Sequence, residues 1–306
     1  MTPTNTPLFL PLTGLYEPSG IRQLPDGRFL VIEDEREYPF SLVELTAGGL
    51  VKHTPLTPGW FQSGKDFWKL EDLEGLALDS AGWLYAITSH SRDDEGAEKK
   101  PRERLVRFRL DGQRVVKPAV VNGLKPALLA AHPLLAAAAQ ILDVKGGGGL
   151  NIEGLALTPD AKQLLIGFRS PLQDGRALIA SVENLAAVFE QDAAPQVSNA
   201  LQTLDLAGQG IRGMAHVPAL NGYLVIGGPI AREGEFSLWF WSGQPAAPAR
   251  RVTVAGLPGF ANAEGVCPAV MNGAPKIVIV SDDGDRKQGH PAHFLVLEPG
   301  QLQIAP

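Results

Sequence analysis

The chain has 306 residues, of which 44% are hydrophobic and 20% are charged, and its formal net charge is −6. This composition is typical of a globular protein with a large core, and the acidic balance excludes an extended nucleic-acid surface. The single cysteine, Cys267, excludes an internal disulfide and a cysteine-based zinc site. No apolar run reaches the roughly 18 residues of a membrane span, and no signal-peptide pattern begins the chain. We therefore expect a cytoplasmic protein that has neither membrane nor nucleic-acid partners.

The first two units of sequence pattern extend over 17–56 and 72–121. Each begins with a phrase that ends in an apolar run, EPSGIRQL in the first unit and DLEGLAL in the second. A turn containing Asp-Gly or Ala-Gly follows, and then three more apolar segments, the last of which is the weakest. Short apolar runs separated by such turns indicate antiparallel hairpins. Each unit therefore predicts four antiparallel strands, and the phrase is the first of them. The charged run at 91–104 predicts an exposed loop inside the second unit.

A different pattern separates the second unit from the third. The stretch near 122–142 is rich in Ala and Leu and predicts a short helical insertion, while the glycines at 146–149 predict a loop. The third unit begins with NIEGLAL at 151–157 and carries a second short helical pattern at 183–189. These two segments are the main helices that we expect in the chain.

The fourth and fifth units begin with GIRGMAHV at 210–217 and NAEGVCPA at 262–269. The five phrases align on Gly20, Gly75, Gly154, Gly213 and Gly265, with spacings of 55, 79, 59 and 52 residues. Repeated four-stranded units are the signature of a β-propeller. We predict an all-β fold, a single propeller domain over 1–306 with about five four-stranded blades. A sixth blade would have to lie within 110–150, which lacks the phrase. The terminal segments LFLPL and QLQIA are expected to close the ring by pairing with the last blade.

The first strand of each propeller blade lines the central channel, so the aligned residues before the glycines should share one ring. These residues are Ser19, Glu74, Glu153, Arg212 and Glu264, and two positions earlier stand Glu17, Asp72, Asn151, Gly210 and Asn262. The ends of the second strands add Asp34, His90, Arg169, Asp282 and Asp283. Converging carboxylates repel one another by several kcal/mol in a poorly solvated channel. We therefore expect a cation among them, neutralisation by Arg212 and Arg169, or a protonated carboxyl group with a raised pKa.

These side chains supply the candidate site residues. Glu74, Glu153, Glu264 and Asp282 are candidate ligands of Ca²⁺ or another divalent cation, and no organic cofactor is expected. Glu153 or His90 is a candidate general base, and Arg169 is a candidate for holding substrate oxygens. The channel and anion-binding candidates are Arg212, Arg169, Asp34 and Asp283. For Arg169 we expect a mostly buried side chain that either pairs with a channel glutamate or faces an open pocket.

Three tracts carry a resemblance to a known family. NIEGLAL with the following LLIGFRSPLQDGRALI, then GIRGMA, and then AEGV with IVIVSDDGD resemble an uncharacterised bacterial family, domain-of-unknown-function family 3616. The resemblance covers most of the chain and implies a propeller-like fold without an assigned activity. The Glu-Gly phrases are also similar to those of calcium-dependent propellers of the gluconolactonase-like and phytase-like esterase groups. This second likeness implies a calcium-dependent hydrolase.

Two classes of function fit these observations. The first is a metal-dependent esterase, lactonase or phosphoesterase that acts on a small anionic substrate. The second is a non-enzymatic propeller that binds a small ligand or a protein partner and has a structural ring of Glu and Arg. A cation or a solvent-filled cavity on the axis would favour the first, and a channel plugged by Glu–Arg pairs would favour the second. Propellers host both classes, so the sequence leaves the choice open.

Overall fold

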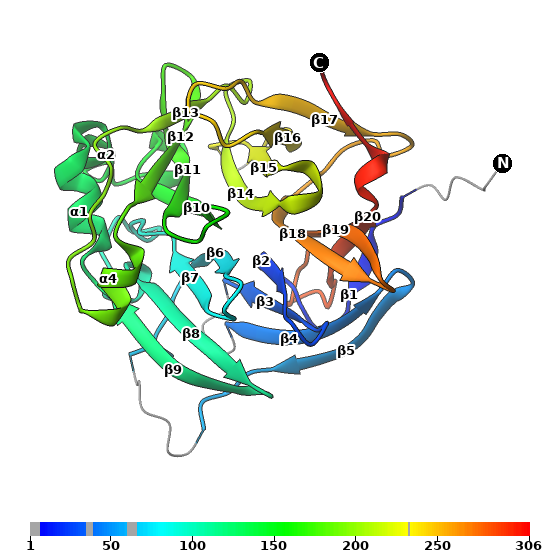
Figure 1. Ribbon diagram of the computed structural model, residues 1–306. Coiled ribbons are helices and arrows are strands. Elements are labelled where there is room, and N and C mark those ends of the chain that lie inside the picture. Colours follow the sequence, from blue (N-terminus) through cyan, green and yellow to red (C-terminus); the bar gives the residue numbers. More distant parts are fainter. Residues whose placement is uncertain (1–6, 35–38, 60–65, 232) are drawn as a thin grey trace.

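Five antiparallel sheets form a ring around a common centre, as Figure 1 shows for the computed structural model. The structure describes residues 7–34, 39–59, 66–231 and 233–306. The prediction of a five-bladed propeller is therefore confirmed. The alternative of six blades is wrong, because 110–150 contributes the end of the second blade and a group of helices.

Within each blade the strands follow the chain from the centre of the ring toward its rim. The first blade contains β2 (Pro18–Gln23), β3 (Phe29–Glu33), β4 (Phe40–Thr46) and β5 (Gly49–Pro55). The second contains β6 (Leu73–Leu78), β7 (Leu84–Thr88), β8 (Leu105–Asp111) and β9 (Arg114–Val121). The third contains β10 (Asn151–Leu157), β11 (Leu164–Gln173), β12 (Arg176–Val182) and β13 (Gln202–Leu204). The fourth contains β14 (Gly210–Val217), β15 (Gly222–Gly228), β16 (Ser237–Trp241) and β17 (Arg250–Val254). The fifth contains β18 (Ala263–Met271), β19 (Ala274–Ser281) and β20 (Ala292–Leu297).

The two terminal strands complete different blades. The N-terminal strand β1 (Leu10–Leu12) pairs with β20 and becomes the outermost strand of the fifth blade, so the ring closes there as expected. The C-terminal strand β21 (Leu302–Ile304) pairs with β17 and adds a fifth strand to the fourth blade. The prediction that both termini pair with the last blade is therefore wrong for the C-terminus. The outer edge of the fifth blade is already occupied by β1, whereas the edge of β17 is free to accept a strand.

A β-bulge interrupts the pairing of the first and second strands at the same place in every blade. In the second blade Leu73 pairs with Thr88 and Gly75 pairs with Ile87, so Glu74 is the extra residue between them. The other four blades skip the equivalent residue before the phrase glycine. A bulge redirects the side chain of its extra residue. The recurring phrase therefore places one side chain per blade at the start of the channel.

The phrase glycine is required by the close approach of neighbouring blades. A Cβ atom on Gly75 would lie 2.6 Å from the Cβ atom of Leu155 on the third blade. A Cβ atom on Gly213 would overlap the carbonyl oxygen of Glu264 on the fifth blade. A side chain at these positions would push the first strands apart and disturb the ring of residues that they carry.

Five clusters of buried apolar side chains form the core, one between each pair of adjacent blades. Three helices cover the outside of the interface between the second and third blades (Figure 1): α1 (Leu124–Ala131), α2 (Pro133–Ala138) and α4 (Leu185–Glu190). The described chain also contains the short helix α3 (Val144–Gly147) and 3₁₀ turns at Lys100–Arg102, Pro218–Leu220 and Pro299–Gln301. Both predicted helical segments are thus confirmed, although Gly146 and Gly147 lie in α3 and not in a loop. Among the described helices, none has the length and apolar character of a membrane span.

Candidate functional site

A polar cavity of about 200 Å³ lies where the five first strands begin; we call it the axial cavity. Its charged lining consists of eight carboxylates and four guanidinium groups: Glu17, Asp34, Asp72, Glu74, Asp94, Glu153, Glu264 and Asp282, with Arg92, Arg102, Arg169 and Arg212. The structure therefore brings together eight of the residues expected at the channel: Ser19, Asp34, Glu74, Glu153, Arg169, Arg212, Glu264 and Asp282. The excess of carboxylates gives the cavity a negative character.

Arg212 connects three blades on one side of the axis. Its Nε atom lies 2.9 Å from Oε2 of Glu153, and its Nη2 atom is ion-paired with Oε1 of Glu264. All three side chains are at least nine-tenths buried. Burial opposes the charge of Arg212, but Glu153 and Glu264 raise its pKa above the ordinary value. This half of the cavity is therefore closed by a buried Glu–Arg–Glu lock.

Arg169 reinforces the lock from the end of β11. Its Nη1 atom donates to Oε1 of Glu153 at 3.1 Å, while its Nε and Nη2 atoms donate to the carbonyl groups of Pro229 and Ala231. Asn151 donates to the same glutamate oxygen at 3.0 Å. The expectation that Arg169 is buried and paired with a channel glutamate is confirmed. Because these partners occupy its donors, Arg169 is not a free anion receptor.

The opposite half of the cavity is acidic and is organised around Asp72. This carboxylate accepts hydrogen bonds from the hydroxyl groups of Ser89 and Ser91 and lies 3.0 Å from Nη1 of Arg102. Asp34 lies close enough to Asp72 for the charge of Asp72 to raise the pKa of Asp34. Like charges at such positions repel one another, and a bound cation would relieve this repulsion.

Burial raises the pKa of the carboxyl groups in this acidic half. Protein atoms surround the carboxyl group of Asp34 although solvent reaches it at the rim of the cavity, and burial together with the charge of Asp72 raises its pKa to about 8. Burial and then the charge of Glu153 raise the pKa of Glu74 well above its ordinary value. Asp34 is therefore mostly protonated below about pH 8 when no cation is present, and the pKa of Glu74 is shifted in the same direction.

Two further carboxyl groups titrate near neutrality. Burial, followed by the charge of Glu17, raises the pKa of Asp282 to about 6. Burial raises the pKa of Glu264 to about 8 even though Arg212 acts in the opposite direction. The ion pair with Arg212 favours the ionised form of Glu264, and its raised pKa shows how strongly burial and neighbouring carboxylates oppose that form. The cavity therefore contains several groups whose charge depends on pH between about 6 and 8.

His90 lies outside the lining of the axial cavity, contrary to the expectation that it reaches the channel. Its side chain is fully buried, its Nδ1 atom is 2.8 Å from the carbonyl oxygen of Thr88, and burial lowers its pKa to about 4. Its backbone is left-handed, with φ 56°. This conformation turns Ser89 and Ser91 onto the same carboxylate, that of Asp72. We therefore assign His90 the role of positioning Ser89 and Ser91, in place of the general base expected from the sequence.

Asp283 is also separate from the axial cavity. Its carboxylate accepts hydrogen bonds from Ser281 and from the backbone of His293, and it lies 2.8 Å from Nδ1 of the His293 ring. It directly follows Asp282, so the end of β19 directs only one of two adjacent carboxylates toward the axis. The prediction of Asp283 as a channel residue is therefore wrong.

Sequence reasoning placed Asp72 two residues before the ring residue Glu74 but assigned it no role, and it missed Ser91, Arg92 and Arg102. The run at 91–104 was expected to be an exposed loop, yet Arg92 and Arg102 line the axial cavity and Ser91 is buried. For Arg102 the surplus of basic residues in that run was the only indication, because a loop gives no periodic pattern.

The donor chemistry of the acidic half fits a hard divalent cation. Carboxylate and hydroxyl oxygens line this half of the cavity. The charge of Asp72 disfavours ionisation of Asp34, and a bound cation would relieve this repulsion. Among the described residues, however, no three His, Cys, Asp or Glu side chains form a ready-made metal site. The set of metal ligands expected from the sequence also changes, because Glu153 and Glu264 are both ion-paired with Arg212. Asp34, Asp72 and Glu74 are the better candidates.

Comparisons with known proteins give one family match and several matches to solved structures. A family model described as phytase-like, with the description "Esterase-like activity of phytase", matches residues 12–226. The PQQ-bound aldose sugar dehydrogenase of Streptomyces coelicolor is 19% identical, with 95% of this chain and 98% of that chain covered and a TM-score of 0.47. A gluconolactonase from Xanthomonas campestris is 12% identical, with 96% and 91% covered and a TM-score of 0.43. No curated protein matches the chain. The family match agrees with the phytase-like resemblance, while the resemblance to family 3616 stays a prediction.

Proposed function

The chain belongs to the phytase-like family, and from this membership we propose that it is an esterase-type hydrolase with its reaction centre in the axial cavity. The observation that supports the proposal best is the composition of this cavity, where eight carboxylates and four guanidinium groups surround about 200 Å³. Groups with pKa values shifted by burial and by like charges are typical of catalytic sites. The cavity lies at the position where the five bulges direct their side chains.

We propose that Asp34, Asp72 and Glu74 hold a divalent cation, for which Ca²⁺ is the first candidate. A bound cation supplies charge that polarises an ester carbonyl or phosphoryl oxygen. Arg102 contacts one carboxylate of this set, that of Asp72, at 3.0 Å. Ser89 and Ser91 fix the orientation of the same carboxylate. Such support limits the motion of a ligand side chain.

Asp282 is the proposed general base. It lines the axial cavity, and its pKa of about 6 leaves it mostly ionised at neutral pH while it remains more basic than an ordinary aspartate. A base with a pKa just below the working pH is suited to removing a proton from water. Glu153, the earlier candidate, already has Arg169, Arg212 and Asn151 as partners. Its role in this scheme is to hold the wall of the cavity in place.

The charges of the cavity also limit the substrate. Each guanidinium group of the lining is already ion-paired with a carboxylate. An anionic ester would therefore be repelled by the remaining carboxylates unless it enters together with the cation. We propose small esters that are neutral or that bind as the complex with the cation. This proposal replaces the small anionic substrate that we expected from the sequence.

The alternative is a propeller without catalytic activity, and the Glu153–Arg212–Glu264 lock is the observation that favours it. Hydrolysis of p-nitrophenyl acetate and p-nitrophenyl phosphate, with and without Ca²⁺, separates the two. We expect cation-dependent turnover of at least one ester that falls by about 10²–10⁴-fold in Asp282→Asn, the range for loss of general base catalysis. Asp283→Asn, which changes the adjacent carboxylate outside the cavity, is the matched control. If neither ester is hydrolysed with any divalent cation, the binding module is the better description.

A further inference from the structure

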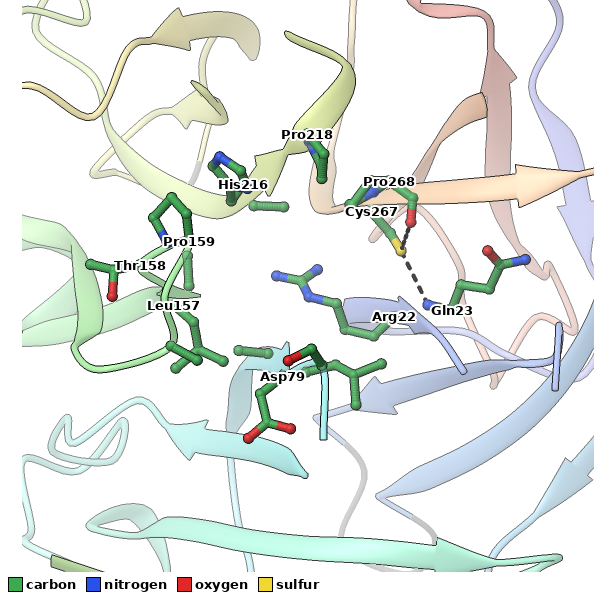
Figure 2. Close-up of a pocket in the computed structure, with 16 residues that line it drawn as sticks. Arg22, Gln23, Asp79, Leu157, Thr158, Pro159, His216, Pro218, Cys267 and Pro268 are labelled. Atoms are coloured by element: carbon green, nitrogen blue, oxygen red, sulfur yellow. Dashed lines mark hydrogen bonds between the residues drawn. The ribbon is translucent and has the colours of Figure 1, made fainter. Parts of the chain in front are cut away.

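A second cavity lies at the opposite end of the channel, where the first strands end; we call it the basal pocket. It has a volume of about 230 Å³ and is lined by residues from the ends of β2, β6, β10, β14 and β18 and from the turns that follow. Figure 2 shows Arg22 reaching from β2 into the middle of this pocket. The function proposed above uses no residue of the basal pocket.

Arg22 forms the floor of the pocket. Its Nη1 atom donates to the carbonyl groups of Ile21 and Val266, and its Nη2 atom donates to those of Leu155 and Met214. These carbonyl groups belong to the first strands of four different blades. Because the N–H bonds of a guanidinium lie in its plane, this plane must lie across the channel. One face of the guanidinium therefore points to the axial cavity, and the other points to the basal pocket.

The charge of Arg22 is not balanced by a direct partner. The side chain is only 8% exposed, and within the described part of the chain no carboxylate is ion-paired with it. Glu74, Glu153 and Glu264 line a gap of about 10 Å³ on its other side, which has room for a single water molecule. Buried charges are normally paired, because an isolated ion loses its hydration without compensation.

The other charged residue of the basal pocket does not supply the missing partner. Asp79 accepts hydrogen bonds from the backbone of Ala81 and Trp83 and from the hydroxyl group of Tyr85. Figure 2 shows its carboxylate pointing away from Arg22. The wall next to Arg22 is formed instead by the neutral thiol of Cys267, whose pKa is raised by burial.

We propose that the basal pocket binds a small organic anion on the guanidinium face of Arg22 that points into this pocket. The hydrogen-bonding edge of the guanidinium is occupied, so the anion is held by charge and by stacking on the face rather than by a bidentate grip. Thr158, Pro159 and His216 are shared with a neighbouring cavity of about 350 Å³ between the third and fourth blades. That cavity has a largely uncharged wall and offers room for the organic part of the ligand.

Calorimetric titration with benzoate and with benzamide tests this proposal, because the two probes have the same shape and differ in charge. The titrations are done in excess chelator, so that no cation in the axial cavity can recruit the anion. We expect benzoate to bind about tenfold more tightly than benzamide, and Arg22→Gln to remove this preference. Asp282→Asn serves as the location control: it removes a negative charge from the axial cavity and would strengthen benzoate binding only if the anion bound there.

A second variant keeps the test decisive if Arg22→Gln does not fold. Ser80 is exposed at the rim of the basal pocket, so Ser80→Trp should fold and obstruct the pocket. We expect this variant to weaken benzoate at least tenfold. Equal affinity for benzoate and benzamide, unchanged binding in Ser80→Trp, or tighter binding in Asp282→Asn would overturn the proposal. None of these outcomes depends on hydrolase activity.

Discussion

The Nε atom of Arg212 lies 2.9 Å from Oε2 of Glu153, which pairs a side chain of the fourth blade with one of the third. The same guanidinium is ion-paired with Glu264 of the fifth blade. Removal of one partner from a buried ion pair leaves an uncompensated charge and costs about 3–5 kcal/mol. The three blades are therefore held in fixed positions around the axis, independently of any bound cation.

The first prediction concerns this lock. Arg212→Met should lower the free energy of unfolding by about 3–5 kcal/mol, because Glu153 and Glu264 stay buried without their shared partner. Chemical denaturation with and without Ca²⁺ measures the effect, which should be similar in both conditions. Glu235→Gln is the control, since it removes an exposed pair with Arg251 that is worth less than about 1 kcal/mol. A loss that appears only with Ca²⁺ would mean that Arg212 acts on the cation site.

The second prediction concerns the cation. Ca²⁺ at a hundredfold excess over its dissociation constant should stabilise the protein by about 2.7 kcal/mol. Asp34→Asn and Glu74→Gln should each remove most of this stabilisation, because they take away oxygens with negative charge from the acidic half. Thermal unfolding with a series of divalent cations measures it. Asp283→Asn should retain the full response, and a full response in the Asp34 and Glu74 variants would exclude this half of the cavity.

The third prediction follows from the raised pKa of Asp34, about 8. This carboxyl group binds a proton in the folded state at pH values where the unfolded chain has released it. Its contribution to stability is therefore fully present below about pH 4 and is lost as pH rises through about 8. We expect the melting temperature of the cation-free protein to fall between about pH 5 and 9, and Asp34→Asn to flatten this slope.

Proton binding by Asp34 and Glu74 also links the affinity for a cation to pH. A divalent cation must displace the protons of Asp34 and Glu74, so its affinity should increase as pH rises from about 6 to 8. Calorimetry in buffers with different ionisation enthalpies should show release of protons on binding. Binding without proton release would mean that these carboxyl groups are already ionised.

The fold could be predicted from the sequence because its determinants are local. The bulge, the phrase glycine and the following hairpin lie close together in the sequence, so the start of each blade can be recognised from a short segment. The destination of the C-terminal strand could not be predicted in this way. Its pairing with β17 depends on which blade edge remains open after β1 has bound to β20.

The candidate site likewise has one part that follows from the local repeat and another part that does not. Glu74, Glu153, Arg212 and Glu264 could be aligned because they occupy one position in a repeat. The different positions of Asp282 and Asp283 could not be predicted in this way. Both residues follow the same strand, and only packing decides which of them faces the axis. Arg102 enters the cavity from the short 3₁₀ turn Lys100–Arg102 within the run at 91–104, and its contact with Asp72 follows from the path of that run.

The fourth prediction concerns the phrase glycine. Gly213→Ala should destabilise the protein by about 1–3 kcal/mol or more, because its methyl group would overlap the carbonyl oxygen of Glu264. Denaturant unfolding measures the change. Gly259→Ala is the matched control, because its Cβ atom would have no neighbour within 4 Å and its φ is not left-handed. If both variants unfold alike, close packing of the first strands does not explain the repeated glycine.

The last prediction separates a positioning role of His90 from a chemical one. Asn adopts the left-handed backbone that His90 has at φ 56° and lacks the imidazole, whereas Val resists this conformation. His90→Asn should therefore keep Ser89 and Ser91 on Asp72, and its Ca²⁺ affinity and ester hydrolysis should stay within about threefold of the parent, or about 0.6 kcal/mol. His90→Val should weaken Ca²⁺ at least tenfold. Calorimetric titration and the initial rate of hydrolysis measure the two properties separately. A His90→Asn variant that binds Ca²⁺ normally but hydrolyses the ester a hundredfold more slowly would show that the imidazole takes part in the reaction.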